Sequence, residues 1–252
     1  MQILNKSLKE LNILNNNNED VNEKLKIFFE EISHASKQFN LTGLNGWEDI
    51  RDTLFIRSFR YSSVIDKFFG KDQYLESEKI KILDLGTGAG IPSIPLKILY
   101  PNMNIKLVDS SEKKCHFVES VIKKLNLKNI TVENIRAELL GMSSDRESYD
   151  IVLTRALAKL PTLAELTLPL IRKNGIVVTA KGLLPSQELK DSEYVLSLLG
   201  SSKSQIIKII KPNYISEDNF IIWVKNKKTH KKFPRRNGVP KKDPIIKLFW
   251  WK

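Results

Sequence analysis

A glycine-rich segment, Asp84-Leu85-Gly86-Thr87-Gly88-Ala89-Gly90, follows an apolar stretch of the chain. Glycines in such a loop let the backbone turn sharply and approach a ligand without interference from Cβ. A phosphate-binding loop would need a Lys-Ser/Thr pair after the last glycine, and the dinucleotide motif would need glycine at position 91, but Ile91-Pro92 follows here. The segment fits the acid-apolar-Gly-x-Gly-x-Gly pattern of methyltransferases and indicates S-adenosylmethionine. A glycine turn needed only for packing is the alternative.

Two later acidic residues could complete an adenosyl site. Asp109 ends the next expected strand, where a carboxylate can accept hydrogen bonds from both ribose hydroxyl groups, although an acid there can also cap a helix. The third strand leads to Ala137-Glu138, a turn that would lie beside the adenine; a solvated loop acid is an equally good interpretation. From these patterns, the predicted cofactor contacts in the loop and at the second strand are Asp84, Gly86, Gly88, Gly90 and Asp109.

The end of the fourth expected strand carries no general base. Residues 154–158 lack the Asn/Asp-Pro-Pro-aromatic tetrad typical of enzymes that methylate exocyclic amines. Methylation of pyrimidine carbon 5 needs a thiolate nucleophile, but Cys115, the only cysteine, falls inside an expected helix, where it packs as a small apolar residue. The remaining acceptors are nucleophilic without deprotonation, such as guanine N7, and the protein would mainly align them. No residue is a certain catalytic group. Arg155 and Lys181 are candidates for positioning the substrate. The alternative for Arg155 is an ion pair with a neighbouring acid, and the alternative for Lys181 is an ordinary loop lysine without a function.

Positive charge is concentrated near the C-terminus. The 252 residues carry a formal net charge of +12; residues 225–242 hold nine Lys/Arg and no Asp/Glu, so the other 234 residues carry +3. Such a segment favours a polyanionic partner, either nucleic acid or an anionic membrane surface. Two prolines and a glycine predict an extended arm rather than a helix, with a disordered solubilising tail as the alternative. The candidate RNA contacts are Lys231, Lys232, Arg235 and Arg236.

Other features narrow the class of protein and its compartment. Cys115 is the only cysteine and the three histidines show no metal-ligand spacing, so we expect neither a disulfide partner nor a metal. The N-terminus lacks the apolar core of a signal peptide, and no uninterrupted apolar run approaches the length of a membrane span. We therefore expect a cytoplasmic monomer without a membrane partner.

Helical and strand-like segments follow one another in a regular order. Residues 1–18 are expected to form a loop or a frayed end, and amphipathic helices are expected over 19–39 and 47–69. Strands then alternate with helices, which predicts a parallel sheet with right-handed crossovers. One of these helices is expected over 160–172, ending before Asn174-Gly175. The expected strands cover 79–85, 104–109, 130–134, 149–154, 176–180, 205–211 and 219–225.

The last two strands have no helix between them and should form an antiparallel pair. The predicted fold class is thus α/β: a Rossmann-like class I methyltransferase fold with a mainly parallel seven-stranded sheet, an antiparallel edge hairpin and an N-terminal helical extension. The expected domains are the helical extension (1–78), an S-adenosylmethionine-binding methyltransferase domain (79–225) and a basic C-terminal arm (226–252).

The motifs together resemble the bacterial RsmG (GidB) family over about residues 20–225. The matching segments are 40–42, 83–92, 107–110, 136–138, 154–158 and 180–182. The resemblance implies an S-adenosylmethionine-dependent methyltransferase that modifies N7 of a guanine in 16S ribosomal RNA, acting on free RNA or on the small ribosomal subunit. It also implies cofactor contacts at Gly86, Ile91, Ala137, Glu138 and Arg155.

One segment departs from the family pattern. The family usually has Arg-His-x-x-Asp-Ser before the first strand, whereas this chain has Ser58 and Tyr61 in place of the His and the Asp. If those two residues support the cofactor pocket or the RNA contact, this chain does so differently. Two alternative functions therefore stay open: an RNA-binding module that keeps the methyltransferase fold without activity, and a small-molecule methyltransferase that does not use the basic arm.

Overall fold

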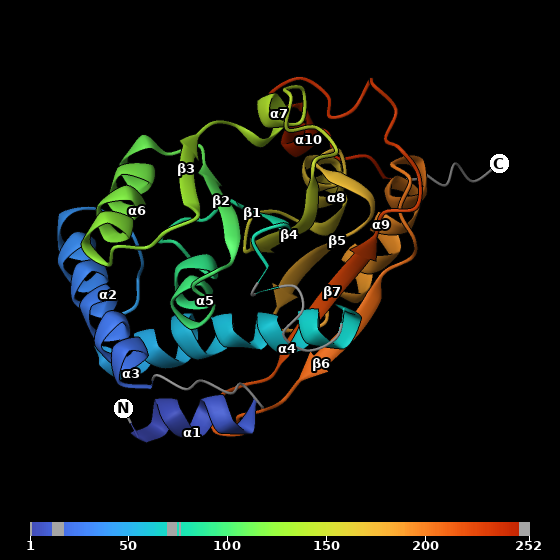
Figure 1. Cartoon of the computed structure of the whole chain (residues 1–252). Coiled ribbons are helices and arrows are strands. Elements are labelled where there is room, and N and C mark those ends of the chain that lie inside the picture. The colour runs from blue at the N-terminus through green and yellow to red at the C-terminus, as the bar shows by residue number, and fades with distance from the viewer. Residues whose placement is uncertain (1, 12–17, 70–74, 76, 247–252) are drawn as a thin grey trace.

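One seven-stranded β-sheet forms the centre of the computed structural model, which describes residues 2–11, 18–69, 75 and 77–246 (Figure 1). The strand order is β3-β2-β1-β4-β5-β7-β6. Strands β1 to β5 pair in parallel, and β7 pairs antiparallel with both β5 and β6. The predicted sheet is therefore confirmed. Its strands are β1 (Lys81–Leu85), β2 (Asn104–Asp109), β3 (Ile130–Asn134), β4 (Tyr149–Arg155), β5 (Ile171–Lys181), β6 (Gln205–Ile209) and β7 (Asp218–Val224).

Strand β1 lies where the winding of the sheet reverses. Asp84 on β1 has Leu107 of β2 on one side and Leu153 of β4 on the other. The chain leaves β1 toward β2 and β3, and later crosses back to β4 and β5. In open α/β sheets the connections diverge at this point and leave a crevice at the carboxyl ends of the strands. The sheet order thus locates the ligand site next to the glycine loop.

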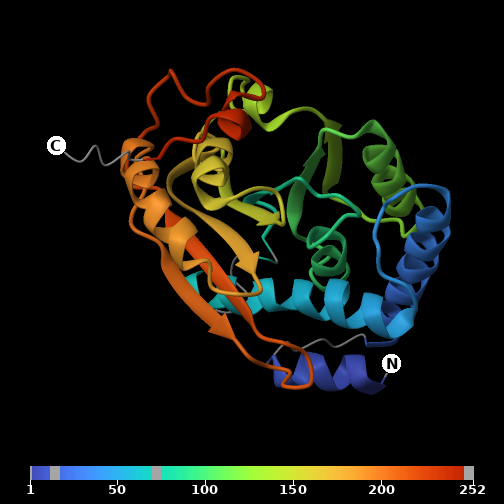
Figure 2. The same ribbon diagram turned by 180° about the vertical axis from the view of Figure 1, so that it is seen from behind.

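Helices cover both faces of the sheet (Figure 1 and Figure 2). The helices α2, α4, α5 and α6 contribute to one hydrophobic cluster, and α8 and α9 to the other. Ile82 and Leu83 of β1 belong to different clusters because successive side chains of a strand point to opposite faces. The helices after β1 are α5 (Ser93–Leu99), α6 (Glu112–Lys124), α7 (Ala137–Leu140), α8 (Leu160–Thr167), α9 (Ser186–Leu198) and α10 (Val239–Lys242).

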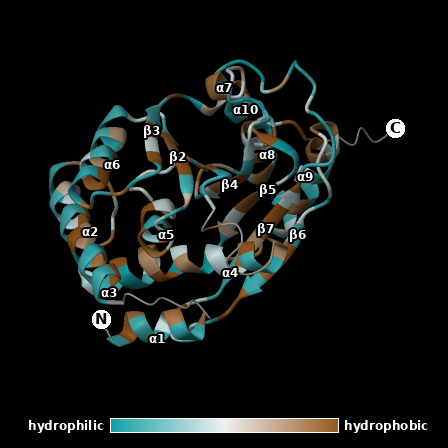
Figure 3. Cartoon of the chain, viewed as in Figure 1, coloured by the Kyte–Doolittle hydropathy of each residue, from teal (hydrophilic) through white to brown (hydrophobic). Residues whose placement is uncertain are grey.

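The helices before β1 pack on the same core as the sheet. They are α1 (Gln2–Glu10), α2 (Asn18–Gln38), α3 (Trp47–Ile50), the π-helix η1 (Arg51–Ile56) and α4 (Arg57–Phe69). Hydrophobic and hydrophilic residues alternate around α1 (Figure 3). The expectation of a loop or frayed end is wrong for residues 2–10, because Leu4 and Leu8 are buried in the core and stabilise α1. Residues 12–17 of the same expectation lie outside the described residues.

The helix predicted over 160–172 is too long. Helix α8 ends at Thr167 and β5 begins at Ile171, so Asn174-Gly175 lies inside a strand and not at a helix end. Strand β5 pairs with β4 on both sides of an irregularity in register. A Cβ on Gly175 would lie 2.7 Å from the carbonyl oxygen of Asp150. The glycine therefore allows two strands to approach closely, a role that its sequence neighbours do not reveal.

A buried charged cluster ties α4 to the start of β7. Arg60 is fully buried and donates hydrogen bonds to the carbonyl oxygens of Lys211 (2.9 Å) and Ser216 (2.7 Å) and to the carboxylate of Asp218. Arg57 pairs with the same carboxylate at 3.0 Å. Burial lowers the pKa of Arg60, and the hydrogen bond that Arg60 donates to Asp218 opposes that effect. Asp218 therefore compensates a charge that has no access to water.

We expect Asp218→Ala to lower the free energy of unfolding by about 3 to 5 kcal/mol, because Arg60 would stay buried without its ionic partner. Glu217→Ala is the matched control, because the exposed pair between Glu217 and Lys208 should contribute less than about 1 kcal/mol. Urea unfolding followed by circular dichroism measures both changes. Equal losses in the two variants would contradict the assignment.

Among the described residues, no helix combines the length and apolar character needed to cross a bilayer.

Candidate functional site

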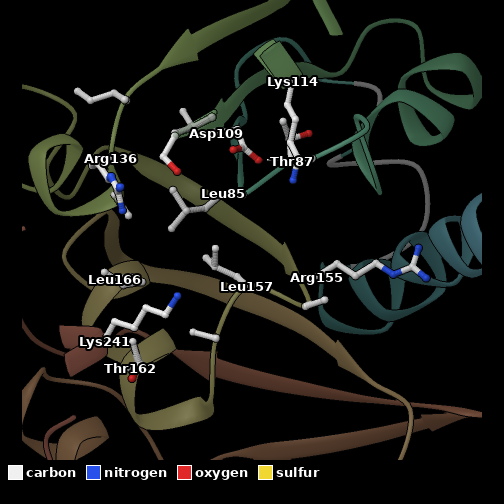
Figure 4. Close-up of a pocket in the computed structure, with 18 of the residues that line it drawn as sticks. Leu85, Thr87, Asp109, Lys114, Arg136, Arg155, Leu157, Thr162, Leu166 and Lys241 are labelled. Carbon is white, nitrogen blue, oxygen red and sulfur yellow. Dashed lines mark hydrogen bonds between the residues drawn. The ribbon is translucent and has the colours of Figure 1, made fainter. Parts of the chain in front are cut away.

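A cavity of about 870 Å³ opens at the carboxyl ends of β1, β2 and β4 (Figure 4). Its volume is in the range of small-molecule and cofactor sites. Asp84 and Gly90, although part of the glycine loop, do not line it, and neither do Lys181 or the four candidate RNA contacts. The structure does bring together seven of the predicted site residues, which line the cavity: Gly86, Gly88, Ile91, Asp109, Ala137, Glu138 and Arg155.

The glycine loop has a backbone that other residues rarely adopt, with φ of +77° at Gly86 and +58° at Gly88. The amides of Gly86 and Thr87 donate to the carbonyl of Val108 at 2.8 and 3.0 Å, which holds the loop across the end of β2. A Cβ on Gly86 would lie 2.6 Å from Leu157, so this glycine serves packing. A Cβ on Gly88 would meet only one atom, at 4.0 Å, so this glycine faces open space.

Asp84 stabilises the glycine loop through a buried hydrogen bond. Its carboxylate is fully buried and accepts a hydrogen bond from the Thr87 hydroxyl at 2.8 Å. Burial raises the pKa of the Asp84 carboxyl group from its ordinary value of 3.8 to about 7, although the hydroxyl groups of Ser93 and Thr87 oppose this effect. Asp84 therefore acts on the cavity through the loop and does not reach it.

Asp109 connects the loop to the start of α6. One carboxylate oxygen accepts from the amide of Gly88 and the other from the amide of Ser111, each at 2.9 Å. Each oxygen can accept a further hydrogen bond, and the residue lines the cavity. The two interpretations of this acid are therefore compatible, because the geometry that caps backbone amides leaves acceptor positions toward a ligand.

Glu138 lies on α7 and is not a solvated loop acid. It is 6% exposed, and its carboxylate accepts a hydrogen bond from the amide of Gly238 at 2.9 Å. Gly238 belongs to the basic C-terminal segment, which the sequence places one hundred positions further on. The turn after β3 is thus joined to the C-terminal arm at the wall of the cavity, where Ala137, Glu138 and Gly238 all lie.

Arg155 ends β4, but its guanidinium group points away from the glycine loop (Figure 4). Nη2 donates to the carbonyl oxygen of Thr53 in η1 at 2.8 Å. Nη1 is buried and has no hydrogen-bond partner among the described residues. Burial lowers the pKa of this group. Within the described part of the chain no carboxylate forms an ion pair with Arg155, so that alternative does not account for it.

The two residues that depart from the family pattern have clear structural partners. Ser58 is buried and its hydroxyl donates to the carbonyl oxygen of Leu54 at 2.5 Å. Tyr61 is also buried, and its hydroxyl donates to the carbonyl oxygen of Thr154 at 2.7 Å, directly before Arg155. Burial raises the pKa of Tyr61, which keeps this donor protonated. Tyr61 therefore supports the end of β4 by a neutral hydrogen bond.

Lys181 ends β5 beside the cavity but does not line it. Its ammonium group pairs with Glu188 of α9 at 3.1 Å and donates to the carbonyl oxygen of Ala158 at 3.3 Å. The same Glu188 carboxylate accepts from the amide of Leu160 at 2.9 Å. Lys181 thus joins the loops after β4 and β5.

Residues 226–246 of the C-terminal arm fold back on the protein and are not extended. Residues 239–242 form the short helix α10, so the expectation against a helix is wrong there. The glycine and the proline do not prevent this helix, because Gly238 precedes it with φ +79° and Pro240 lies in the first turn, a position that proline tolerates. Phe233 is buried, and its carbonyl oxygen accepts from Arg146 at 2.6 Å. Arg235 pairs with the buried Glu165 at 2.8 Å. Lys231, Lys232 and Arg236 are exposed.

Several lining residues were not among the sequence candidates. The motif segments 40–42, 83–92, 107–110 and 136–138 contain Thr42, Thr87, Ser110 and Arg136. Lys241 and Lys242 belong to the basic run, and nothing in that run indicated that α10 would reach the cavity. The additional lining residues with polar side chains are Thr42, Thr87, Ser110, Lys114, Arg136, Thr162, Asn237, Lys241 and Lys242.

The strand order, the glycine loop after β1 and the acid after β2 define a class I methyltransferase fold. Two solved structures are similar to this chain. One is a putative S-adenosyl-L-methionine-dependent methyltransferase from Methanococcus maripaludis, with a TM-score of 0.53 and 16% identity, covering 74% of this chain and 98% of that chain. The other is a putative sarcosine dimethylglycine methyltransferase from Galdieria sulphuraria, with a TM-score of 0.51 and 14% identity, covering 82% and 99%. At these identities the likeness concerns the fold.

The chain belongs to the GidB family, rRNA small subunit methyltransferase G, whose model matches residues 21–214. Two curated relatives carry the name Ribosomal RNA small subunit methyltransferase G. The one from Oceanobacillus iheyensis is 37% identical over 240 residues, which cover 95% of this chain and 96% of the relative. The one from Leuconostoc citreum is 38% identical over 226 residues, which cover 88% and 90%. The resemblance inferred from the motifs is confirmed.

The raised pKa of Asp84 has a consequence for stability. The pKa of Asp84 is about 7 in the folded state and 3.8 ordinarily, so the folded state binds this proton more tightly than the unfolded state does. The bound proton therefore stabilises the folded state at low pH, and this stabilisation is lost as the pH rises from about 4 to about 7. We expect Asp84→Asn, which cannot ionise, to gain roughly 1.4 kcal/mol of unfolding free energy per pH unit relative to the wild type in that window. Urea unfolding at a series of pH values tests this. A difference between variant and wild type that does not change with pH would contradict it.

Proposed function

We propose that this protein transfers a methyl group from S-adenosylmethionine to N7 of a guanine in 16S ribosomal RNA. The observation that carries the proposal is the cavity lined by the glycine loop and Asp109, at the point where the sheet winding reverses, in a member of the GidB family. Free RNA and the small ribosomal subunit are the proposed partners, and the cytoplasm is the proposed location of a monomeric enzyme.

The residues of the cavity fit this cofactor. Asp109 keeps acceptor positions for the two ribose hydroxyl groups, and Gly88 leaves the open space that a close-lying adenosyl group needs. Ala137 and Glu138 would lie beside the adenine. Arg155 lines the cavity at the end of β4 and would lie beside the methionine part of the cofactor. Gly86 and Ile91 complete the proposed contacts, while Asp84 and Gly90 would act by shaping the loop.

When bound, the cofactor supplies a methyl group activated by a sulfonium centre. The protein's residues would hold the acceptor in line with it, and proximity and orientation lower the barrier. Among the described lining residues the carboxylates are Asp109 and Glu138, and both already accept hydrogen bonds from backbone amides. We therefore assign neither carboxylate the role of a general base. Guanine N7 offers a lone pair at neutral pH and needs no removal of a proton.

The exposed cations of the arm fit a polyanionic partner. Lys231, Lys232 and Arg236 are exposed and form no ion pair with another described residue, so they are available for phosphate contacts. Such contacts position RNA without reading its sequence. Arg235 differs, because its guanidinium is shared between Glu165 and Asp243; we assign to it the anchoring of the arm. Lys181 would likewise act by fixing loops. We assign residues 1–78, 79–225 and 226–252 to the helical extension, the methyltransferase domain and the arm.

Methyl transfer to unmodified 16S RNA and to small subunits, from labelled S-adenosylmethionine at low salt, tests the proposal. We expect one N7-methylated guanine per RNA, located by mass spectrometry of nuclease digests. Failure of the wild-type protein to label either substrate would contradict the proposal.

We expect Asp109→Ala to weaken S-adenosylmethionine binding by about 10- to 100-fold, because hydrogen bonds to a charged group contribute about 1.5–3 kcal/mol. Asp191→Ala is the control, since Asp191 lies on α9 and does not line the cavity. Isothermal titration calorimetry measures both affinities. Unchanged affinity in Asp109→Ala would remove this residue from the site.

A further inference from the structure

Helix α10 brings two lysines to the rim of the cofactor cavity. Lys241 and Lys242 are exposed and both line the cavity, together with Asn237 and Gly238 from the same arm. In Figure 4 the side chain of Lys241 reaches into the cavity near Thr162 and toward Leu157. These lysines lie far from the glycine loop in sequence, and only the folded arm brings them to the cavity that the loop also lines.

The arm holds these lysines in a defined place. The amide of Gly238 is bonded to Glu138 at 2.9 Å, and the carbonyl oxygen of Pro240 accepts from the Thr162 hydroxyl at 3.1 Å. These two bonds flank Val239 and join α10 to α7 and to α8. Further back, Arg235 is bonded to the buried Glu165 of α8 through its amide and its guanidinium group. Helix α10 is therefore anchored at its N-terminal end.

The lack of an ionic partner distinguishes these lysines from Arg235 of the same arm. Arg235 pairs with Glu165 and with Asp243, the acid that follows Lys242 in sequence. Lys241 and Lys242 form no ion pair within the described part of the chain. The cavity also has Lys114 and Arg136 in its lining, so cations exceed carboxylates there.

The proposed cofactor does not account for this excess of positive charge. S-adenosylmethionine carries a sulfonium, an ammonium and a carboxylate group, and is itself a net cation. Added lysines at the rim would therefore repel it unless an anion binds at the same time. The anion must come with the methyl acceptor, and a nucleotide inserted into the cavity leaves its own phosphates at the rim.

We propose that Lys241 and Lys242 bind the backbone phosphates that flank the methylated nucleotide and so position its base in the cavity. This inference rests on the proposed function and names the residues that hold the RNA strand at the site. They are positioning residues, because they act on the phosphates and not on the reacting atoms. Their effect on the reaction comes from alignment, which a displacement of about 1 Å can reduce roughly 100-fold.

The test compares the double variant K241Q/K242Q with K227Q/K228Q in the full-length protein. Both remove two adjacent exposed positive charges from the arm. Lys227 follows β7 beside Gly200 at the end of α9, where the amide of Lys227 donates to the Gly200 carbonyl, and neither control lysine lines the cavity. The measurements are kcat and KM for 16S RNA, the salt dependence of kcat/KM, and the affinity for S-adenosylmethionine.

We expect K241Q/K242Q to lower kcat/KM by about 10- to 100-fold, with kcat reduced even at saturating RNA. The slope of log(kcat/KM) against log salt should become shallower by about 1 to 2, as expected for two lost phosphate contacts. Affinity for S-adenosylmethionine should change less than about 2-fold, a limit set by screening of exposed charges. K241R/K242R should keep most of the activity, and K227Q/K228Q should resemble the wild type.

An active wild type with equal losses in the two Gln double variants, or an unchanged salt slope in K241Q/K242Q, would overturn this inference alone. A wild type that binds S-adenosylmethionine but methylates no RNA would overturn the proposed function, and this inference with it.

Discussion

The attachment of the glycine loop to the ends of β1 and β2 is the constraint on which the site depends. The carbonyl oxygen of Val108 accepts hydrogen bonds from the amides of Gly86 and Thr87. The carboxylate of Asp109 accepts one from the amide of Gly88, and that of Asp84 accepts one from the Thr87 hydroxyl. These bonds exist only because β1 and β2 are neighbours in register. The same contacts that satisfy the turn's polar groups leave open space at Gly88 and spare acceptors on Asp109, so one arrangement stabilises the fold and forms the cavity.

The other walls of the cavity come from segments distant in sequence. The C-terminal arm bonds to Glu138 and contacts α8, and Tyr61 of α4 supports the end of β4. The ends of β1, β2 and β4 contribute to the cavity on one side, and the arm contributes Lys241 and Lys242 at the rim, which form no ion pair with another described residue. The proposed cofactor site at the sheet and the proposed polyanion site on the arm thus share one cavity.

Buried charges fix the appended segments to the sheet. Arg60 with Asp218 fastens the N-terminal helices to β7, and Arg235 with Glu165 fastens the arm to α8. Arg235 is a candidate RNA contact in the sequence because it belongs to the basic run. The run itself contains no sign of which of its cations will form an ion pair within the protein. Pairing depends on a carboxylate 70 positions away, and such a separation leaves no local pattern. Helix α1 was missed in the same way, because its burial depends on partners elsewhere in the core.

The sequence by itself determined the alternation of strands and helices, the sheet plan, the glycine loop and the family, because these follow from local periodicity and from motifs of fixed spacing. It could not determine that β5 starts at Ile171, since that depends on close approach of Gly175 to Asp150. Nor could it show that Arg155 points toward Thr53, or that α10 reaches the cavity. Those features were decided by the tertiary structure, because side-chain direction, ion pairing and pocket walls arise from contacts between residues that are far apart in the chain.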